Sequence, residues 1–267
     1  MIHALIIKGY GINCEKEMAL ACQLAGASPI TMHAKDFFTN PVSLDKVHLL
    51  LLPGGFSFGD ELGAAKAFAN RLTYSSKIKD RLHAFVDRGG CILGVCNGFQ
   101  LLVKLGLLPD GKEQEVSLAN NDSLRFENRW AHHAVAPSPC VFTKGLEQLY
   151  LPIRHGEGKL VFKNEQVHKR LVEQNQIVFR YANADGTPTQ SYPDNPNGSM
   201  DAIAGLCDPT GRVLGMMAHP EACLRFFHQP AWIREKEIGK RQQSTAIQDS
   251  DGLKLFKNGI NYLKENL

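Results

Sequence analysis

Short apolar runs alternate with stretches of helical spacing over the first hundred residues of the chain. The runs that predict strands are 3–8, 28–33, 48–53 and 91–93. The stretches in which apolar positions recur every three or four residues are 15–25, 61–72, 76–88 and 99–105. Continuous apolar strands between helices are typical of a parallel sheet covered on both faces, so this half predicts a doubly wound α/β fold.

The pattern changes after Leu108. Short strands, mostly antiparallel, are expected at 115–118, 124–130 and 134–141, followed by a helix at 164–175 and a further strand at 177–181. The apolar runs 202–206 and 213–217 flank the turn Asp208–Gly211, which predicts a hairpin. Residues 224–250 are charged and weakly patterned, and 253–263 predict a terminal helix.

No repeat, low-complexity tract or linker interrupts these elements. We therefore expect a single domain over 1–267, with a core at about 3–223 and a C-terminal extension and helix at 224–267.

Composition and charge exclude several classes of partner. The chain is 43% hydrophobic and 21% charged, as in ordinary globular proteins. A formal charge of +3, with no basic run between aromatic residues, argues against binding to nucleic acid or to an anionic membrane. No apolar stretch is long enough for a membrane span, and Met1–Lys8 lacks a signal-peptide pattern.

The seven cysteines follow no framework. Their number is odd, their spacings are scattered, and no Cys-x-x-Cys occurs, so neither a disulfide scaffold nor a metal site is predicted. The adjacent pair His132 and His133 would point to opposite faces of a strand and is a poor metal motif. We expect reduced thiols in a cytoplasmic protein that binds no metal.

Candidate chemistry begins at Cys96, which lies between Gly94 and Gly98 where the strand at 91–93 gives way to a helix. Glycines permit a tight turn there, and the following helix supplies N–H groups and a positive dipole end that favour a thiolate. This is the arrangement of a nucleophile elbow. The competing interpretation is one more buried cysteine, because free cysteines are among the most buried residues.

A cysteine nucleophile needs a base and a group that orients the base. His219 and Glu221 are two residues apart after the strand predicted at 213–217, so in extended backbone their side chains would leave the same face. The carboxylate could then accept from one imidazole nitrogen while the other nitrogen faces a thiol.

Two glycine-rich segments lie at strand ends. Pro53–Asp60 (PGGFSFGD) follows a buried strand at the carboxyl edge of the sheet, where open α/β folds bind ligands. Gly9 and Gly11 invite a dinucleotide-binding interpretation, but the third glycine of G-x-G-x-x-G is missing, which makes that interpretation a minor one.

With these residues in place, the chain resembles the class I, triad-type glutamine amidotransferases. GVCNGFQ at 94–100 and His219-Pro-Glu221 carry the resemblance. PGGFSFGD, His155–Gly158 (HGEG), Tyr192–Ser199 (YPDNPNGS) and Gly211–Met217 (GRVLGMM) are similar to the glutaminase subunits or domains of phosphoribosylformylglycinamidine synthases. The motifs cover most of 3–223.

The resemblance implies a flavodoxin-like, doubly wound, mixed but mainly parallel sheet with an added antiparallel section. It implies Cys96 as nucleophile, His219 as base and Glu221 as orienting acid. Backbone N–H groups of Gly55 and Asn97 would form the oxyanion hole, and Gln100 would line the glutamine pocket. His155 and Glu157 are candidates for coupling to a partner, or for holding a turn between strands.

The implied reaction also needs a partner. Such glutaminases pass ammonia to an ATP-dependent synthetase that makes formylglycinamidine ribonucleotide in purine biosynthesis. The chain has no G-x-x-x-x-G-K-[ST] loop, so ATP and Mg²⁺ are expected on a separate synthetase subunit, with or without a small third subunit, and no cofactor on this chain. Ala218 stands where the family usually has proline, which leaves the chemistry untouched.

Two alternatives remain open. A stand-alone cysteine hydrolase or deglycase on a flavodoxin-like sheet would share the elbow but would not need His219 and Glu221 at that strand end, nor a partner. A regulatory module that kept the fold would be under no demand to keep the intact triad.

Overall fold

The computed structural model describes residues 1–242 and 249–267. The strands are β1 (His3–Lys8), β2 (Ser28–His33), β3 (Leu49–Leu52), β4 (Cys91–Val95), β5 (Val116–Asn120), β6 (Glu127–Val135), β7 (Gln148–His155), β8 (Glu157–Phe162), β9 (Ile177–Ala182), β10 (Ile203–Cys207) and β11 (Val213–Met216). The helices are α1 (Glu15–Leu24), α2 (Ala34–Thr39), α3 (Lys66–Thr73), α4 (Ser76–Asp87), α5 (Asn97–Lys104), α6 (Glu165–Glu173), α7 (Trp232–Arg241) and α8 (Asp251–Asn266).

One mixed sheet runs through the described part of the molecule in the order β2-β1-β3-β4-β11-β10-β9-β6-β7. Neighbours from β2 to β11 pair in parallel, and neighbours from β11 to β7 pair antiparallel. Strands β5 and β8 form a separate antiparallel pair. The α/β fold with its added antiparallel section is therefore confirmed.

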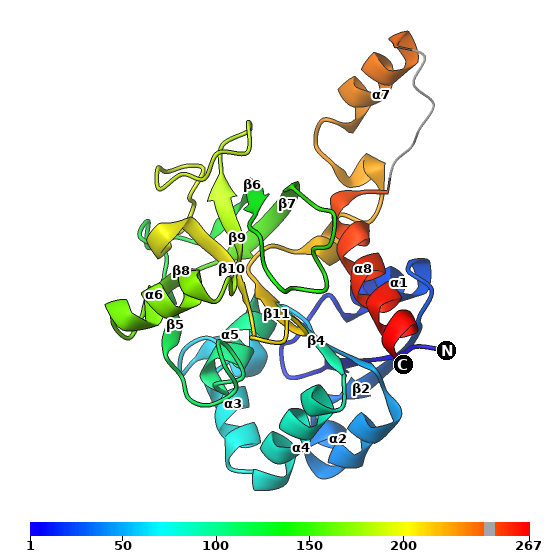
Figure 1. Ribbon diagram of the computed structural model, residues 1–267, viewed down its shortest axis with the longest axis vertical. Coiled ribbons are helices and arrows are strands. Elements are labelled where there is room, and N and C mark those ends of the chain that lie inside the picture. Colours follow the sequence, from blue (N-terminus) through cyan, green and yellow to red (C-terminus); the bar gives the residue numbers. More distant parts are fainter. Residues whose placement is uncertain (243–248) are drawn as a thin grey trace.

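Helices cover both sides of the parallel strands. In Figure 1, α3 and α5 lie to the left of β4 and β11, whereas α1 and α8 lie to the right. Helix α1 contacts α8, and α3 contacts both α4 and α5. Every residue of β3 and β4 is buried, which explains why these strands are continuous apolar runs in the sequence.

Three predicted elements differ clearly from the structure. The strand expected at 124–130 starts at Glu127 and continues to Val135 as β6. The strand expected at 134–141 does not form, because β6 ends at Val135 and the chain enters a loop that contains Pro137 and Pro139, neither of which can donate to a ladder. The helix expected at 61–72 starts only at Lys66. Positive φ angles at Asp60 and Ala65 keep the preceding residues in turns.

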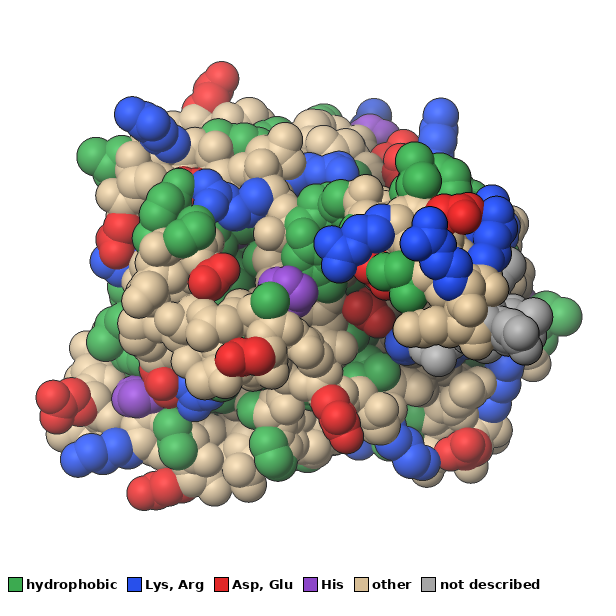
Figure 2. Space-filling model, turned by 90° about the horizontal axis from the view of Figure 1, so that it is seen from above, with side chains coloured by type: hydrophobic (Ala, Val, Ile, Leu, Met, Phe, Trp, Pro, Cys, Tyr) green, Lys and Arg blue, Asp and Glu red, His purple; other side chains and the backbone are tan. Residues whose placement is uncertain are grey.

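The C-terminal extension has two unlike parts. Helix α8 packs back on α1 and on the turn after His219, where Gly252 lies against the backbone of Pro220. Helix α7 buries none of its residues and forms a lobe away from the sheet (Figure 1). Lys and Arg side chains gather over this lobe in Figure 2. Across 1–242 and 249–267, no helix combines the length and apolarity needed to cross a bilayer.

Candidate active site

Cys96 sits at a strained turn between β4 and α5. Its backbone has φ 52° and ψ −106°, a region that L-residues rarely adopt, at a cost of order 1–3 kcal/mol. Its N–H donates to Met216 O at 2.8 Å, so β11 fixes the turn. The flanking glycines serve close packing, since a Cβ at Gly98 would lie 1.9 Å from Leu52 O. The elbow is present as predicted, but the cysteine itself, not its glycines, carries the strain.

His219 and Glu221 form a buried pair beside this thiol. His219 Nδ1 and Glu221 Oε1 are 2.6 Å apart, and the two residues are 3% and 1% exposed. Their backbone is a 3-10 turn that begins after His219, not an extended strand. The predicted contact is therefore correct, although the geometry assumed for it is wrong: Pro220 favours the turn, and the turn folds the carboxylate back onto the ring.

The electrostatics of His219 suit a base. Burial lowers the pKa of its imidazole, but the Glu221 carboxylate and the thiols of Cys14 and Cys96 together raise the pKa well above its usual value. His219 Nε2 has no hydrogen-bond partner among the described residues. The pair therefore presents a basic nitrogen toward two thiols, which can take a proton from a nucleophile.

The loop at 54–57 lies against this pair. A Cβ at Gly54 would stand 2.8 Å from His219 Cε1 and 3.4 Å from Cys96 Cβ, so only glycine fits there. Gly54 O accepts from Asn13 N at 3.0 Å, and Phe56 N donates to Gly11 O at 2.9 Å. Gly55 has φ 114°, which favours glycine. The loop after β3 is thus held by the loop after β1, and it brings Gly54 against His219 and Cys96.

Asn97 ties this loop to helix α5. Its Oδ1 accepts from Ser57 N at 3.2 Å, while its Nδ2 donates to Asp60 Oδ1 at 3.1 Å and to Gln100 Oε1 at 3.0 Å. Gln100, 4% exposed, donates through Nε2 to Glu157 O at 2.6 Å. The Gln100 amide is therefore engaged inside the protein at both ends.

His155 and Glu157 lie where β7 meets β8. His155 is buried and pairs through Nδ1 with Asn121 Oδ1 at 3.2 Å, and burial lowers its pKa to about 3, so the ring is neutral. Glu157 Oε2 accepts from Ala64 N at 3.2 Å. Both residues hold the turn and its neighbours, and Glu157 links that turn to the loop that precedes α3.

Sequence reasoning missed Cys14. This residue follows β1, is half-buried, and donates through Sγ to Asn13 Oδ1 at 3.2 Å. Its Sγ, one ring nitrogen of His219 and one carboxylate oxygen of Glu221 lie within 4.8 Å of one another. The signal that could have found it was topological, because loops that follow parallel strands meet at one edge of the sheet.

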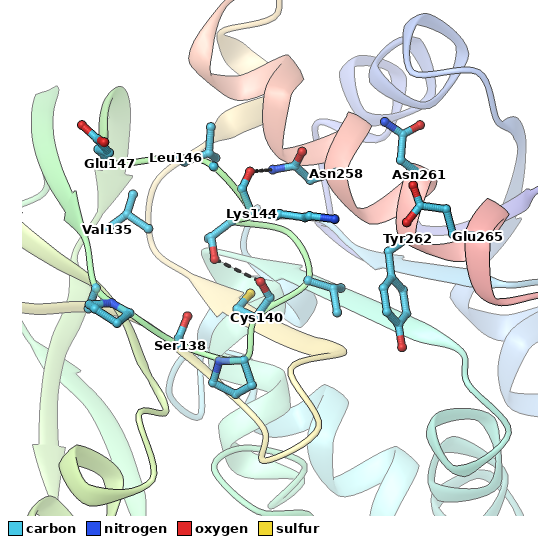
Figure 3. Close-up of a pocket in the computed structure, with 16 residues that line it drawn as sticks. Val135, Ser138, Cys140, Lys144, Leu146, Glu147, Asn258, Asn261, Tyr262 and Glu265 are labelled. Atoms are coloured by element: carbon cyan, nitrogen blue, oxygen red, sulfur yellow. Dashed lines mark hydrogen bonds between the residues drawn. The ribbon is translucent and has the colours of Figure 1, made fainter.

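A separate cavity of about 850 Å³ lies between the loop after β6 and helix α8 (Figure 3). Asn258 donates to Lys144 O at 2.9 Å across one side, and Thr143 Oγ1 donates to Cys140 O at 3.1 Å. Neither Cys96 nor the His219–Glu221 pair lines it. The reactive groups and this cavity are therefore distinct places in the molecule.

Comparison with known proteins gives a consistent family. Residues 1–263 match the model of the CobB/CobQ-like glutamine amidotransferase domain. The chain is 41% identical to the phosphoribosylformylglycinamidine synthase subunit PurQ of Methanococcus maripaludis, over 98% of this chain and 97% of that protein. It is 39% identical to the protein of the same name from Dehalococcoides mccartyi, over 99% and 98% of the two chains.

One solved structure is similar over its whole length. A chain in the structure of PurLQS from Thermotoga maritima is 28% identical, with a TM-score of 0.68 and coverage of 98% of this chain and 99% of that one. A longer relative, the phosphoribosylformylglycinamidine synthase of Drosophila melanogaster, is 32% identical over 98% of this chain, which spans only 20% of that protein.

Proposed function

The chain belongs to the family of CobB/CobQ-like glutamine amidotransferase domains, and from that premise we propose that it is the glutaminase subunit of a phosphoribosylformylglycinamidine synthase. It hydrolyses glutamine to glutamate and ammonia, and the ammonia passes to a separate synthetase subunit. That subunit uses ATP to convert formylglycinamide ribonucleotide to formylglycinamidine ribonucleotide in purine biosynthesis.

One observation carries the proposal. The thiol of Cys96, at a strained turn, lies beside the buried imidazole of His219, and Nδ1 of that ring is 2.6 Å from Glu221 Oε1. Cys96 is the nucleophile, His219 the base and Glu221 the orienting acid. The elbow fixes the sulfur, and Glu221 selects the tautomer that leaves Nε2 free to accept the thiol proton.

The chemistry proceeds in two halves. Nε2 of His219 takes the Cys96 proton as Sγ attacks the carboxamide carbon of glutamine, and the imidazolium then protonates the leaving nitrogen, which departs as ammonia. A glutamyl thioester remains. His219 next takes a proton from water, the hydroxide attacks the thioester, and glutamate leaves with the thiol restored.

The backbone N–H groups of Gly55 and Asn97 stabilise the oxyanion that forms on the glutamine carboxamide. Two converging donors suit a tetrahedral oxyanion, and one donor is typically worth about 3 kcal/mol. Ser57 N donates to Asn97 Oδ1 and Asn13 N donates to Gly54 O, and these two bonds hold the loop in place. Gln100 lines the glutamine pocket, where its bonds with Asn97 and Glu157 hold the amide in place while one N–H and one lone pair stay free for substrate.

The partner completes the reaction. ATP and Mg²⁺ belong to the synthetase subunit, and the relatives named as subunits, together with the similar chain in PurLQS, support such an assembly. His155 and Glu157 support coupling, because Glu157 joins the β7–β8 turn to the loop before α3. We place the protein in the cytoplasm, where its seven free thiols remain reduced.

The test is reconstitution with the synthetase subunit of the same organism. Amidine formation from glutamine should require both proteins, whereas the synthetase alone should use only added ammonium salt. Amidine formation from glutamine by the synthetase alone would overturn the proposal. A glutamate-release rate for the chain alone equal to that in the complex would favour a stand-alone hydrolase.

A further inference from the structure

Two carboxylates from different loops meet beside the glutamine pocket. Asp60 ends the glycine-rich loop after β3, and Glu157 is the first residue of β8. Glu157 Oε2 accepts from Ala64 N at 3.2 Å, and Asp60 Oδ1 accepts from Ala65 N at 3.1 Å. Because these two N–H groups belong to consecutive residues, they hold the carboxylates close to each other. Glu157 Oε1 accepts no hydrogen bond from a described residue, so it is free for a ligand.

This carboxylate pair lacks a cation. No Lys or Arg among the described residues forms an ion pair with either group, although Lys104 of α5 acts on both from a greater distance. Burial, together with the charge of Glu157, raises the pKa of the Asp60 carboxyl above its usual value, and the bonds from Ala65 and Asn97 offset this only in part. Two like charges in a half-buried place are unfavourable unless an opposite charge joins them. A cationic group on the substrate supplies that charge.

Both carboxylates are tied to the immediate surroundings of the nucleophile. Asn97, next to Cys96 in the chain, donates through Nδ2 to Asp60 Oδ1 at 3.1 Å. Cys96 Sγ donates to Arg154 O at 3.6 Å, and the turn that begins there leads to Glu157. Only two methylene groups separate the carboxamide of glutamine from its α-carbon. When Sγ attacks the carboxamide, the α-ammonium of the same molecule therefore stays close to these loops.

Two almost fully buried polar side chains in the same network have unused hydrogen-bonding capacity. Gln100, 4% exposed, bonds to Asn97 and to Glu157 O, and it retains one N–H and one lone pair. Ser57, 1% exposed, donates its N–H to Asn97 Oδ1, whereas its Oγ has no partner among the described residues. Buried polar groups normally have partners. Their unused capacity is independent evidence that a polar ligand belongs in this network.

We propose that Asp60 and Glu157 bind the α-ammonium group of glutamine and thereby restrict the site to the free amino acid. An ammonium group has three N–H donors, and the two carboxylates together with the remaining lone pair of Gln100 Oε1 supply three acceptors. A carboxamide without the ammonium leaves both carboxylates without a cation, which disfavours its binding. The inference rests on the proposed function, because it takes glutamine as the substrate.

The first test compares glutamine with glutaramate, the same carboxamide without the α-ammonium, as a source of ammonia in the complex with the synthetase subunit. In the wild type, kcat/KM for glutamine should exceed that for glutaramate by at least about a hundredfold, because the unpaired carboxylates reject the analogue. In Asp60→Asn and in Glu157→Gln this ratio should fall by about tenfold or more, the scale of a charged hydrogen bond. A structural role alone would lower both values alike, and an unchanged ratio would overturn the proposal.

The variants are chosen to keep the loop intact. Asparagine tolerates the positive φ of Asp60, and its Oδ1 can still accept from Ala65 N. The matched control is Glu61→Gln, which removes the neighbouring carboxylate, an exposed one. This control should keep the wild-type ratio. A ratio that falls as far in Glu61→Gln as in Asp60→Asn would show a general effect of charge and would overturn the assignment.

The second test measures binding without turnover. In calorimetry with Cys96→Ala, alone and with the synthetase subunit, glutamine should bind at least about tenfold more tightly than glutaramate, and adding Asp60→Asn should remove most of that preference. Equal affinities for the two ligands, or no binding of either, would overturn the proposal. A wild-type chain that prefers glutamine in this way yet releases no ammonia in the complex would instead contradict the proposed hydrolysis and leave the ammonium site standing.

Discussion

Two loops of this protein deliver a cysteine to the same imidazole. The first loop, residues 9–14, joins β1 to α1, and the elbow, residues 94–98, joins β4 to α5. Each follows a buried parallel strand, and each contains a cysteine of positive φ at the N-cap of the next helix. Both cysteines therefore lie at the carboxyl edge of the sheet, where open α/β folds gather their reactive groups.

The two loops differ in backbone and burial. Cys14 has φ 68° and ψ 13°, an ordinary left-handed conformation, and its side chain is half-buried. Cys96 has ψ −106° and is 5% exposed, with its N–H bound to Met216 O and Gly98 packed against Leu52. In both loops, a cysteine between a parallel strand and a helix places its thiol at the carboxyl edge of the sheet. Only the elbow holds the sulfur rigidly, and this rigidity separates a nucleophile from a neighbouring thiol.

The largest effect is expected when the thiol of Cys96 is removed. Cys96→Ala should lower glutamine-dependent amidine synthesis by about a millionfold, the scale seen when a hydrolase loses its nucleophile, while ammonia-dependent synthesis by the complex stays intact. Cys14→Ser should keep most of the glutamine-dependent rate. The measurement is product formation with each nitrogen source. If the two cysteine variants lost activity equally, the comparison between the loops would fail.

Chemical labelling is a second way to compare the reactivity of Cys96 and Cys14. A glutamine-mimicking electrophile should modify Cys96 and spare Cys14 and Cys91, as read by peptide mass spectrometry, because only the elbow presents its sulfur to a bound carboxamide. Modification of Cys14 in the wild type would show that the first loop carries the nucleophile.

Next in size is the loss of the shared imidazole. His219→Ala should reduce glutamate release in the complex by between about ten-thousand- and a millionfold, because the thiol then lacks a base and the leaving amide lacks an acid. Steady-state turnover with saturating glutamine measures it, with thermal unfolding as a check on folding. Wild-type turnover in His219→Asn would refute the triad.

A smaller loss is expected from the orienting carboxylate. Glu221→Gln should lower turnover by about a thousand- to ten-thousandfold, since it perturbs the tautomer and charge of His219 without removing the base.

The same substitution should change the pH profile. Burial lowers the pKa of His219 and the Glu221 carboxylate raises it, so removing that charge lets the imidazolium lose its proton at lower pH. The limb of the pH–rate profile that reports this group should therefore move to lower pH in Glu221→Gln. An unmoved limb would mean that Glu221 does not set the charge of His219.

The smallest expected effect concerns activation by the partner. The loop that carries Gly55 also carries Phe56, which is 48% exposed and lies 6.2 Å, centroid to centroid, from the exposed ring of Phe126. We expect the substrate-loaded synthetase to raise glutamate release at least about tenfold, because one misaligned oxyanion donor costs about a hundred- to a thousandfold. Phe56→Ala should weaken that rise.

The matched control is Tyr74→Ala, which removes an aromatic ring that is 89% exposed at the end of α3. This variant should be activated like the wild type. Equal activation of Phe56→Ala and Tyr74→Ala would show that the partner does not act through the 54–57 loop.

The sequence alone determined the features that depend on near neighbours. Apolar runs identified β3 and β4, and the glycines around Cys96 identified the elbow. Both features could be predicted because the burial of a strand and the steric limits of a turn depend on a few consecutive residues. The His219–Glu221 contact was also predictable, since its partners are two residues apart, even though a 3-10 turn rather than a strand brings them together.

Only the tertiary structure decided the rest. Cys14 meets His219 across 205 positions of the chain, and Gln100 meets Glu157 across 57. The start of α3 depends on backbone conformations at Asp60 and Ala65 that a helical pattern does not reveal. Such contacts are set by strand order and packing, which periodicity does not encode, so the second thiol at the site became visible only once the chain was folded.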